Sequence, residues 1–130
     1  MCGITCVFGG TTCTLTGLRH RGPDNTRRIT NGKCTMIFTR LAINGLSDSG
    51  MQPFESTTGT VNLMCNGEIF NHLDLIPNAS NRSDCECLIP LIDTHGIFKA
   101  SQMIRGEFAI CWTDGDRVMA SRDPFGVRPL

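Results

Sequence analysis

Short apolar segments separated by turn-forming residues are the feature of this sequence that most limits its possible folds. Each segment is rich in β-branched, aromatic or other apolar residues and is bounded by Gly, Asn or Asp, a pattern typical of strands and turns. The last two segments flank Asp114-Gly115-Asp116 and predict a hairpin. The predicted strands are Ile4–Phe8, Thr35–Leu41, Val61–Cys65, Glu107–Thr113 and Arg117–Ser121.

Helical signal is concentrated between residues 83 and 104. Ser83 and Glu86 form a capping-box pattern, and apolar residues then recur at helical spacing. Pro90 is expected to kink or shorten this helix, and Gly96 lies where a helix C-cap is expected. Phe98–Ile104 predicts a second short helix. Because strand signal exceeds helix signal, the predicted fold class is α+β.

Asn66-Gly67 directly follows the third predicted strand. Both residues tolerate positive φ, and the pair is a strong local signal for a turn. The sequence therefore predicts a tight turn that ends Val61–Cys65.

Length and charge argue against several classes of protein. The 130 residues are expected to form one domain, residues 1–130. Twelve basic and twelve acidic side chains give a net charge of zero, which argues against binding to nucleic acid or to a membrane surface through a basic patch. No segment reaches the roughly 18 apolar residues of a membrane-spanning helix. We therefore expect no nucleic-acid partner and no membrane partner.

Cysteine is abundant, with eight residues in the chain. The proportion is nevertheless below that of a disulfide scaffold, and the N-terminus lacks the pattern of a signal peptide. The sequence therefore predicts reduced thiols in the cytoplasm, most of them acting as small apolar side chains. The cysteines are Cys2, Cys6, Cys13, Cys34, Cys65, Cys85, Cys87 and Cys111.

Cys2 differs from the other cysteines because it directly follows the initiator methionine. A small second residue permits removal of Met1, which would give Cys2 a free α-amine. Such an amine has a reference pKa of about 7.7–8.0 and can act as a base toward the thiol of the same residue. Thiols are also the most nucleophilic side chains near neutral pH. Cys2 is therefore a candidate nucleophile that carries its own general base.

Seven motifs follow one another along almost the whole chain: Met1–Ile4 (MCGI), Arg19–Asp24 (RHRGPD), Thr39–Ile43 (TRLAI), Asn66–His72 (NGEIFNH), Ser83–Glu86 (SDCE), Arg105–Ala109 (RGEFA) and Arg122–Leu130 (RDPFGVRPL). In this order they resemble the class II glutamine amidotransferases, which are N-terminal-nucleophile hydrolases. The resemblance is closest to the glutaminase domain of asparagine synthetases. It implies a four-layer α/β/β/α sandwich.

The reaction implied by the resemblance is hydrolysis of the glutamine side-chain amide to glutamate and ammonia. Cys2 would attack the amide carbonyl and form a glutamyl thioester, while its α-amine moves the proton. The side-chain amide of Asn66 and the backbone N–H of Gly67 would form the oxyanion hole. No cofactor and no metal are expected.

Substrate binding is also implied by the resemblance. Arg40 would bind the α-carboxylate of glutamine, and the carboxylates of Glu68 and Asp84 would bind its ammonium group. In the RHRGPD motif, Arg21 is expected to form an internal ion pair with Asp24 or another carboxylate. Backbone groups of the three residues after Arg40 would complete the pocket wall: Leu41, Ala42 and Ile43.

Two departures from the family bear on partners. The stretches after Phe8 and His72 are short and favour little helix, so one helical layer should be reduced. The sheet face left uncovered predicts a homodimer or a docked partner. The chain contains no phosphate-binding loop, so the ammonia is expected to pass to a separate synthetase domain or protein.

Two alternatives remain open. Cys85-x-Cys87 together with Cys2, Cys6 or Cys65 would supply thiolates for a metal, although this spacing lacks the paired second half of a typical zinc site. The other alternative is a catalytically inactive interaction domain that keeps the fold. The presence of every residue of the expected site argues against the second alternative.

Overall fold

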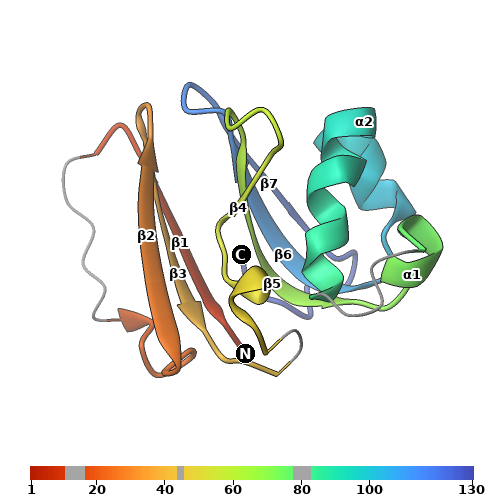
Figure 1. Ribbon diagram of the computed structural model, residues 1–130, viewed down its shortest axis with the longest axis horizontal. Coiled ribbons are helices and arrows are strands. Elements are labelled where there is room, and N and C mark those ends of the chain that lie inside the picture. The colour runs from red at the N-terminus through yellow and green to blue at the C-terminus, as the bar shows by residue number, and fades with distance from the viewer. Residues whose placement is uncertain (11–16, 44–45, 78–82) are drawn as a thin grey trace.

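The computed structural model describes residues 1–10, 17–43, 46–77 and 83–130, which form three layers in Figure 1. A three-stranded antiparallel sheet faces a four-stranded antiparallel sheet, and helices cover the outer face of the four-stranded sheet. No described α-helix covers the three-stranded sheet. The α+β prediction with one reduced helical layer is therefore confirmed for the described residues. Cys13 lies outside them.

The three-stranded sheet has the order β1-β3-β2. β1 (Gly3–Phe8) and β3 (Cys34–Arg40) confirm two predicted strands. β2 (Asn25–Asn31) was not predicted, because most of its side chains are exposed at the edge of the sheet and it lacks the apolar alternation of a half-buried strand. In the register of this sheet, Gly3 pairs with Thr39, so the residue before β1 lies beside the end of β3.

The four-stranded sheet has the order β4-β5-β6-β7. β6 (Gly106–Thr113) and β7 (Val118–Arg122) confirm the predicted hairpin. β5 (Asn62–Ile69) pairs with β6 over its whole length, and the short β4 (Phe54–Glu55) pairs only with the first two residues of β5. The second half of β5 therefore has a sheet edge on the side opposite β6.

The predicted turn at Asn66-Gly67 is wrong. β5 continues through both residues, which pair with Ala109 and Phe108 of β6. Gly67 does not have a positive φ. A Cβ atom there would lie 2.1 Å from the backbone oxygen of Glu107, so this position requires glycine for a close approach between strands.

The helical region begins as predicted from Ser83. The capping box between Ser83 and Glu86 is present, and the 3-10 helix η3 (Asp84–Cys87) continues directly into α2 (Leu88–Met103). Gly96, with φ 72°, interrupts α2, which agrees with a first helix ending there and a second following. The predicted kink at Pro90 is wrong because Pro90 lies in the first turn of α2, where its missing N–H removes no helical hydrogen bond.

Two apolar cores hold the layers together. One lies between α2 and the β5–β6 sheet and contains Leu88, Ile92 and Phe108. The other lies between the two sheets and contains Phe38 and Met64. The remaining described helices, η2 (Asp48–Gly50) and α1 (His72–Leu75), are single turns. No helix in the described residues is long and apolar enough to span a membrane.

Candidate active site

A cavity of about 110 Å³, here called the site cavity, opens where the start of β1, the end of β3 and the second half of β5 meet. All predicted site residues except Ala42 line it: Cys2, Arg40, Leu41, Ile43, Asn66, Gly67, Glu68 and Asp84. The backbone N–H of Ala42 instead donates a 2.7 Å hydrogen bond to the Asp24 carboxylate. Segments far apart in sequence thus bring the predicted residues to one place.

Cys2 is held beside the residue that follows β3. The Leu41 N–H donates to Cys2 Sγ at 3.4 Å, and the thiol lies 3.6 Å from the Leu41 carbonyl oxygen. Arg21 Nε donates to the Cys2 carbonyl at 3.2 Å. Among the described residues Arg21 forms no ion pair with Asp24 or another carboxylate, so the expected ion pair is wrong. Arg21 instead positions the backbone of Cys2, and Asp24 anchors the segment after β3 through Ala42.

The environment of Cys2 determines the protonation of its thiol. Burial raises the pKa of Cys2 above its ordinary value, although the Leu41 N–H, the chain's N-terminal charge and Arg40 each act to lower it. A thiol with a raised pKa is neutral at pH 7. Cys2 therefore needs a base to become a thiolate, and a free α-amine on the same residue would be one.

The free edge of β5 explains how Gly67 faces the site cavity. The N–H groups of Cys65 and Ile69 point away from β6: they donate to Gln52 Oε1 at 2.6 Å and to Asp84 Oδ2 at 2.7 Å. Gly67 lies between these two residues with the same backbone orientation, because N–H directions alternate along an antiparallel strand. Its N–H therefore points toward this edge, which borders the cavity.

Side chains alternate between the two faces of β5, so Asn66 lies on the face opposite that of Cys65 and Gly67. Asn66 shares that face with Met64, which packs in the core between the two sheets. Its side chain therefore points toward the sheet that carries Cys2, and Asn66 is 4% exposed. One side-chain amide and one backbone N–H thus border the same cavity from adjacent residues, as an oxyanion hole requires.

Arg40, the last residue of β3, is 5% exposed. Its Nη1 donates to the Ser47 carbonyl at 3.0 Å, and the Arg40 carbonyl accepts the Asp24 N–H at 3.0 Å. A buried guanidinium has five donors in a fixed plane, which suits a carboxylate. The position of Arg40 at the cavity wall therefore makes it a suitable carboxylate-binding group.

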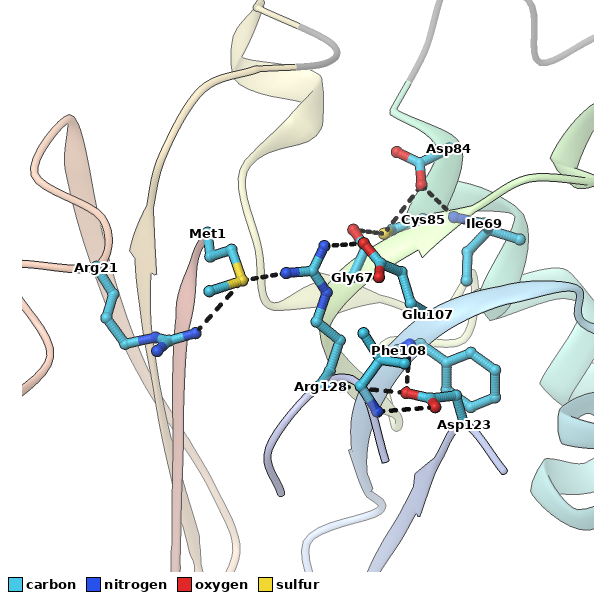
Figure 2. A network of polar contacts seen from close by, with 11 residues as sticks. Met1, Arg21, Gly67, Ile69, Asp84, Cys85, Glu107, Phe108, Asp123 and Arg128 are labelled. Carbon is cyan, nitrogen blue, oxygen red and sulfur yellow. Dashed lines mark hydrogen bonds and ion pairs between the residues drawn. The ribbon is translucent and has the colours of Figure 1, made fainter. Parts of the chain in front are cut away.

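Two carboxylates border the opposite side of the site cavity. Asp84 is 6% exposed, and its Oδ2 accepts the Ile69 N–H and lies 3.6 Å from Cys85 Sγ (Figure 2). Glu68 is exposed at the cavity rim. Asp84 therefore fixes the end of β5 and also brings negative charge to the cavity, where a cation would be favoured.

Two further groups at the cavity were missed by the sequence analysis. Both amide atoms of Gln52 bind the backbone of Cys65, at 2.6 Å and 3.2 Å, so this side chain completes the free edge of β5. Arg128 contacts the sulfur of Met1 and pairs with Glu107 (Figure 2). Gln52 carries no recognisable local signal, whereas Arg128 lies within the RDPFGVRPL motif.

The thiolate metal site is not assembled in the described part of the chain. The seven cysteines described there are all free thiols. No group of three or more His, Cys, Asp or Glu side chains among the described residues is arranged to hold a metal ion. The metal-binding alternative therefore has no support from this geometry.

The whole chain is similar to known proteins of one family. A family model described as a glutamine amidotransferase domain matches residues 1–130. A probable glutamine-hydrolysing asparagine synthetase of Acanthamoeba polyphaga mimivirus is 36% identical over 149 residues, covering 100% of this chain and 27% of that protein. A probable counterpart in Schizosaccharomyces pombe is 40% identical over 123 residues, with 87% of this chain and 21% of that protein covered.

The chain thus spans about a quarter of the length of the curated relatives it matches. The alignment with the viral protein is longer than the chain, so that relative has residues in this region that the chain lacks. Among solved structures, the allosteric regulatory enzyme of purine biosynthesis matches with a TM-score of 0.62 and 25% identity. That match covers 75% of this chain and 25% of the other.

Proposed function

Because the chain belongs to the glutamine amidotransferase domain family, we propose that it hydrolyses the side-chain amide of glutamine to glutamate and ammonia. The fold is that of the N-terminal-nucleophile hydrolases, with one helical layer reduced. The observation that carries the proposal is the position of Cys2 in one cavity with Asn66 and Gly67. We propose that residues 1–130 form a single glutaminase domain.

The proposed first half-reaction begins after removal of Met1. The free α-amine accepts the proton of the Cys2 thiol, and the sulfur attacks the amide carbonyl of glutamine. The Asn66 amide and the Gly67 N–H stabilise the resulting oxyanion. The C–N bond then breaks, the amine returns its proton to the leaving nitrogen, and ammonia departs from a glutamyl thioester.

The second half-reaction restores the enzyme. The same α-amine takes a proton from water, whose oxygen attacks the thioester carbonyl. The oxyanion forms again at the same two donors, the C–S bond breaks, and the thiol recovers its proton. Glutamate is released, so one glutamine and one water have become one glutamate and one ammonia.

Substrate orientation is proposed to come from groups on opposite walls of the site cavity. Arg40 binds the α-carboxylate, and Asp84 and Glu68 bind the α-ammonium. Leu41 and Ile43 complete the wall between them. Ala42 is left out of this wall because it does not line the cavity and its N–H is bonded to Asp24.

Partners and location are also proposed. The ammonia would be taken up by a separate synthetase domain or protein, as the names of the matched asparagine synthetases suggest. The three-stranded sheet, which no described α-helix covers, would be the surface for a second copy or another partner. The free thiols of the described cysteines are consistent with a reducing compartment such as the cytoplasm.

Intact mass spectrometry with diazo-oxo-norleucine, a glutamine-like electrophile, tests the proposed function. We expect the purified chain to lack Met1 and to gain one adduct, which peptide mapping places on Cys2. The variant Cys2→Ala should gain none, whereas Cys6→Ala, which changes a cysteine outside the site cavity, should still react. Retention of Met1 with no adduct, or an adduct that persists in Cys2→Ala, would contradict the proposal.

A further inference from the structure

Arg128 is the charged residue at the site cavity to which neither the family motifs nor the proposed reaction gives a role. Its side chain is 15% exposed, and Nη2 is paired with the Glu107 carboxylate. Nη1 contacts the sulfur of Met1, as Figure 2 shows. Nε is buried without a hydrogen-bond partner. This guanidinium is therefore held, largely out of water, against the N-terminal residue of the chain.

The position of Arg128 is fixed by the backbone around it. The N–H groups of Val127 and Arg128 donate to the Asp123 carboxylate at 3.0 Å and 3.2 Å, and the Phe108 N–H of β6 donates to it at 3.2 Å. Burial acts to raise the pKa of Asp123, but its backbone hydrogen bonds outweigh this and leave the pKa below the usual value. Asp123 thus ties the segment that carries Arg128 to the second sheet.

The N-terminus lies among charges of both signs. Arg21 is on the far side of Met1: its Nη2 lies 4.0 Å from the Met1 sulfur, and its Nε donates to the Cys2 carbonyl. Removal of Met1 would make the Cys2 nitrogen the free α-amine of the chain, on the residue whose carbonyl Arg21 binds. Four charged residues line the site cavity with Cys2: Arg40, Arg128, Glu68 and Asp84. Arg21 contacts the Cys2 carbonyl, and Glu107 pairs with Arg128.

We propose that Arg128 is a positioning residue whose fixed positive charge keeps the Cys2 α-amine unprotonated once Met1 has been removed. A nearby cation disfavours protonation of an amine, and the effect is larger where water is excluded. The Glu107 carboxylate partly offsets that charge and so sets the strength of the effect. This inference rests on the proposed function, because only an unprotonated amine can accept the proton of the thiol.

The pH dependence of kcat/KM for glutamine hydrolysis tests the inference in the chain with Met1 removed. Without the cation the amine binds its proton more tightly. Arg128→Gln should therefore shift the acid limb of the kcat/KM profile to higher pH by about one unit. Arg128→Lys should restore the wild-type limb, and Glu107→Gln should move it downward. A role in folding alone predicts reduced activity in both Arg128 variants with no shift. An unshifted limb in Arg128→Gln overturns the inference.

A measurement without catalysis separates this inference from the proposed function. In a Cys2→Ala chain the thiol is absent, and an NMR titration of the introduced methyl group follows the α-amine directly. Adding Arg128→Gln should raise the midpoint by the same amount as the limb of the rate profile, with Met1 removal checked by mass. If the wild type is inactive but this midpoint moves, the proposed function fails and the charge effect stands. If the wild type is active and the midpoint stays unchanged, only the inference fails.

Discussion

The two walls of the site cavity are built in different ways. The wall from the three-stranded sheet offers Cys2 and Arg40, which are held by contacts at the ends of β1 and β3. The wall from β5 offers Asn66 and Gly67, whose placement follows from strand alternation and from the close approach to β6. Changes on the first wall should therefore alter binding or reactivity, whereas changes on the second should also affect the fold.

The largest expected effect is that of Gly67→Ala on the β5 wall. The new Cβ would meet the Glu107 backbone oxygen at 2.1 Å, and a backbone atom cannot move aside as a side-chain end can. We expect a loss of about 3 kcal/mol or more in the free energy of unfolding, with loss of activity. Urea denaturation followed by circular dichroism measures this loss.

Gly17→Ala is the matched control for that substitution. No atom of the described residues lies within 4 Å of a Cβ built at Gly17, and its φ is not positive, so stability should be unchanged. Equal stability of the Gly67→Ala chain and the wild type would show that the β5 wall tolerates change and would remove the contrast between the walls.

The second largest expected effect is a loss of kcat when Asn66, on the same β5 wall, is replaced. Asn66→Ala removes one of two oxyanion donors and should lower kcat by about 10²–10³. Asn62→Ala is the control, because Asn62 lies on the same face of β5 and is also buried, but bonds to Asn31 away from the site cavity. Steady-state kinetics should show the kcat loss for Asn66→Ala alone. Equal kcat values for the two variants would exclude Asn66 from the oxyanion hole.

Asn66 and Gly67 also show how much of the structure can be predicted from the sequence. Strands with a buried face, the β6–β7 hairpin and the Ser83 cap were predictable because their signals are local. The predicted turn at Asn66-Gly67 was wrong because position 67 requires glycine for its close approach to the backbone of Glu107, which is distant in sequence. The exposed edge strand β2 offered no apolar pattern to recognise.

The same contrast between local signals and tertiary contacts applies to the residues of the site cavity. The order of the motifs sufficed to select the residues that meet there, but it did not reveal what holds them in place. Arg21 bonds to Cys2 and Gln52 bonds to Cys65 through tertiary contacts that no local pattern encodes. The fold decides such contacts, so the supporting residues became visible only in the structure.

On the first wall, Arg40→Lys should weaken substrate binding without changing the fold. A lysine keeps the charge but loses the planar pair of donors that matches a carboxylate, so KM for glutamine should rise about tenfold with a smaller change in kcat. Arg27→Lys is the control, because Arg27 bonds to the Met51 carbonyl and does not line the site cavity. An unchanged KM in Arg40→Lys would assign the α-carboxylate to another group.

The smallest expected effect is a shift in the pH at which Cys2 is alkylated. Burial raises the pKa of its thiol, so at a given pH the native chain contains less thiolate than the unfolded chain. The rate of iodoacetamide labelling at Cys2, measured by peptide mass, should therefore reach its midpoint at a higher pH in buffer than in urea. Arg40→Gln should raise the native midpoint further, because Arg40 favours the thiolate, whereas Arg27→Gln should not. A native midpoint below the unfolded one would mean that the wall carrying Cys2 activates the thiol by itself, and the α-amine would then not be needed as its base.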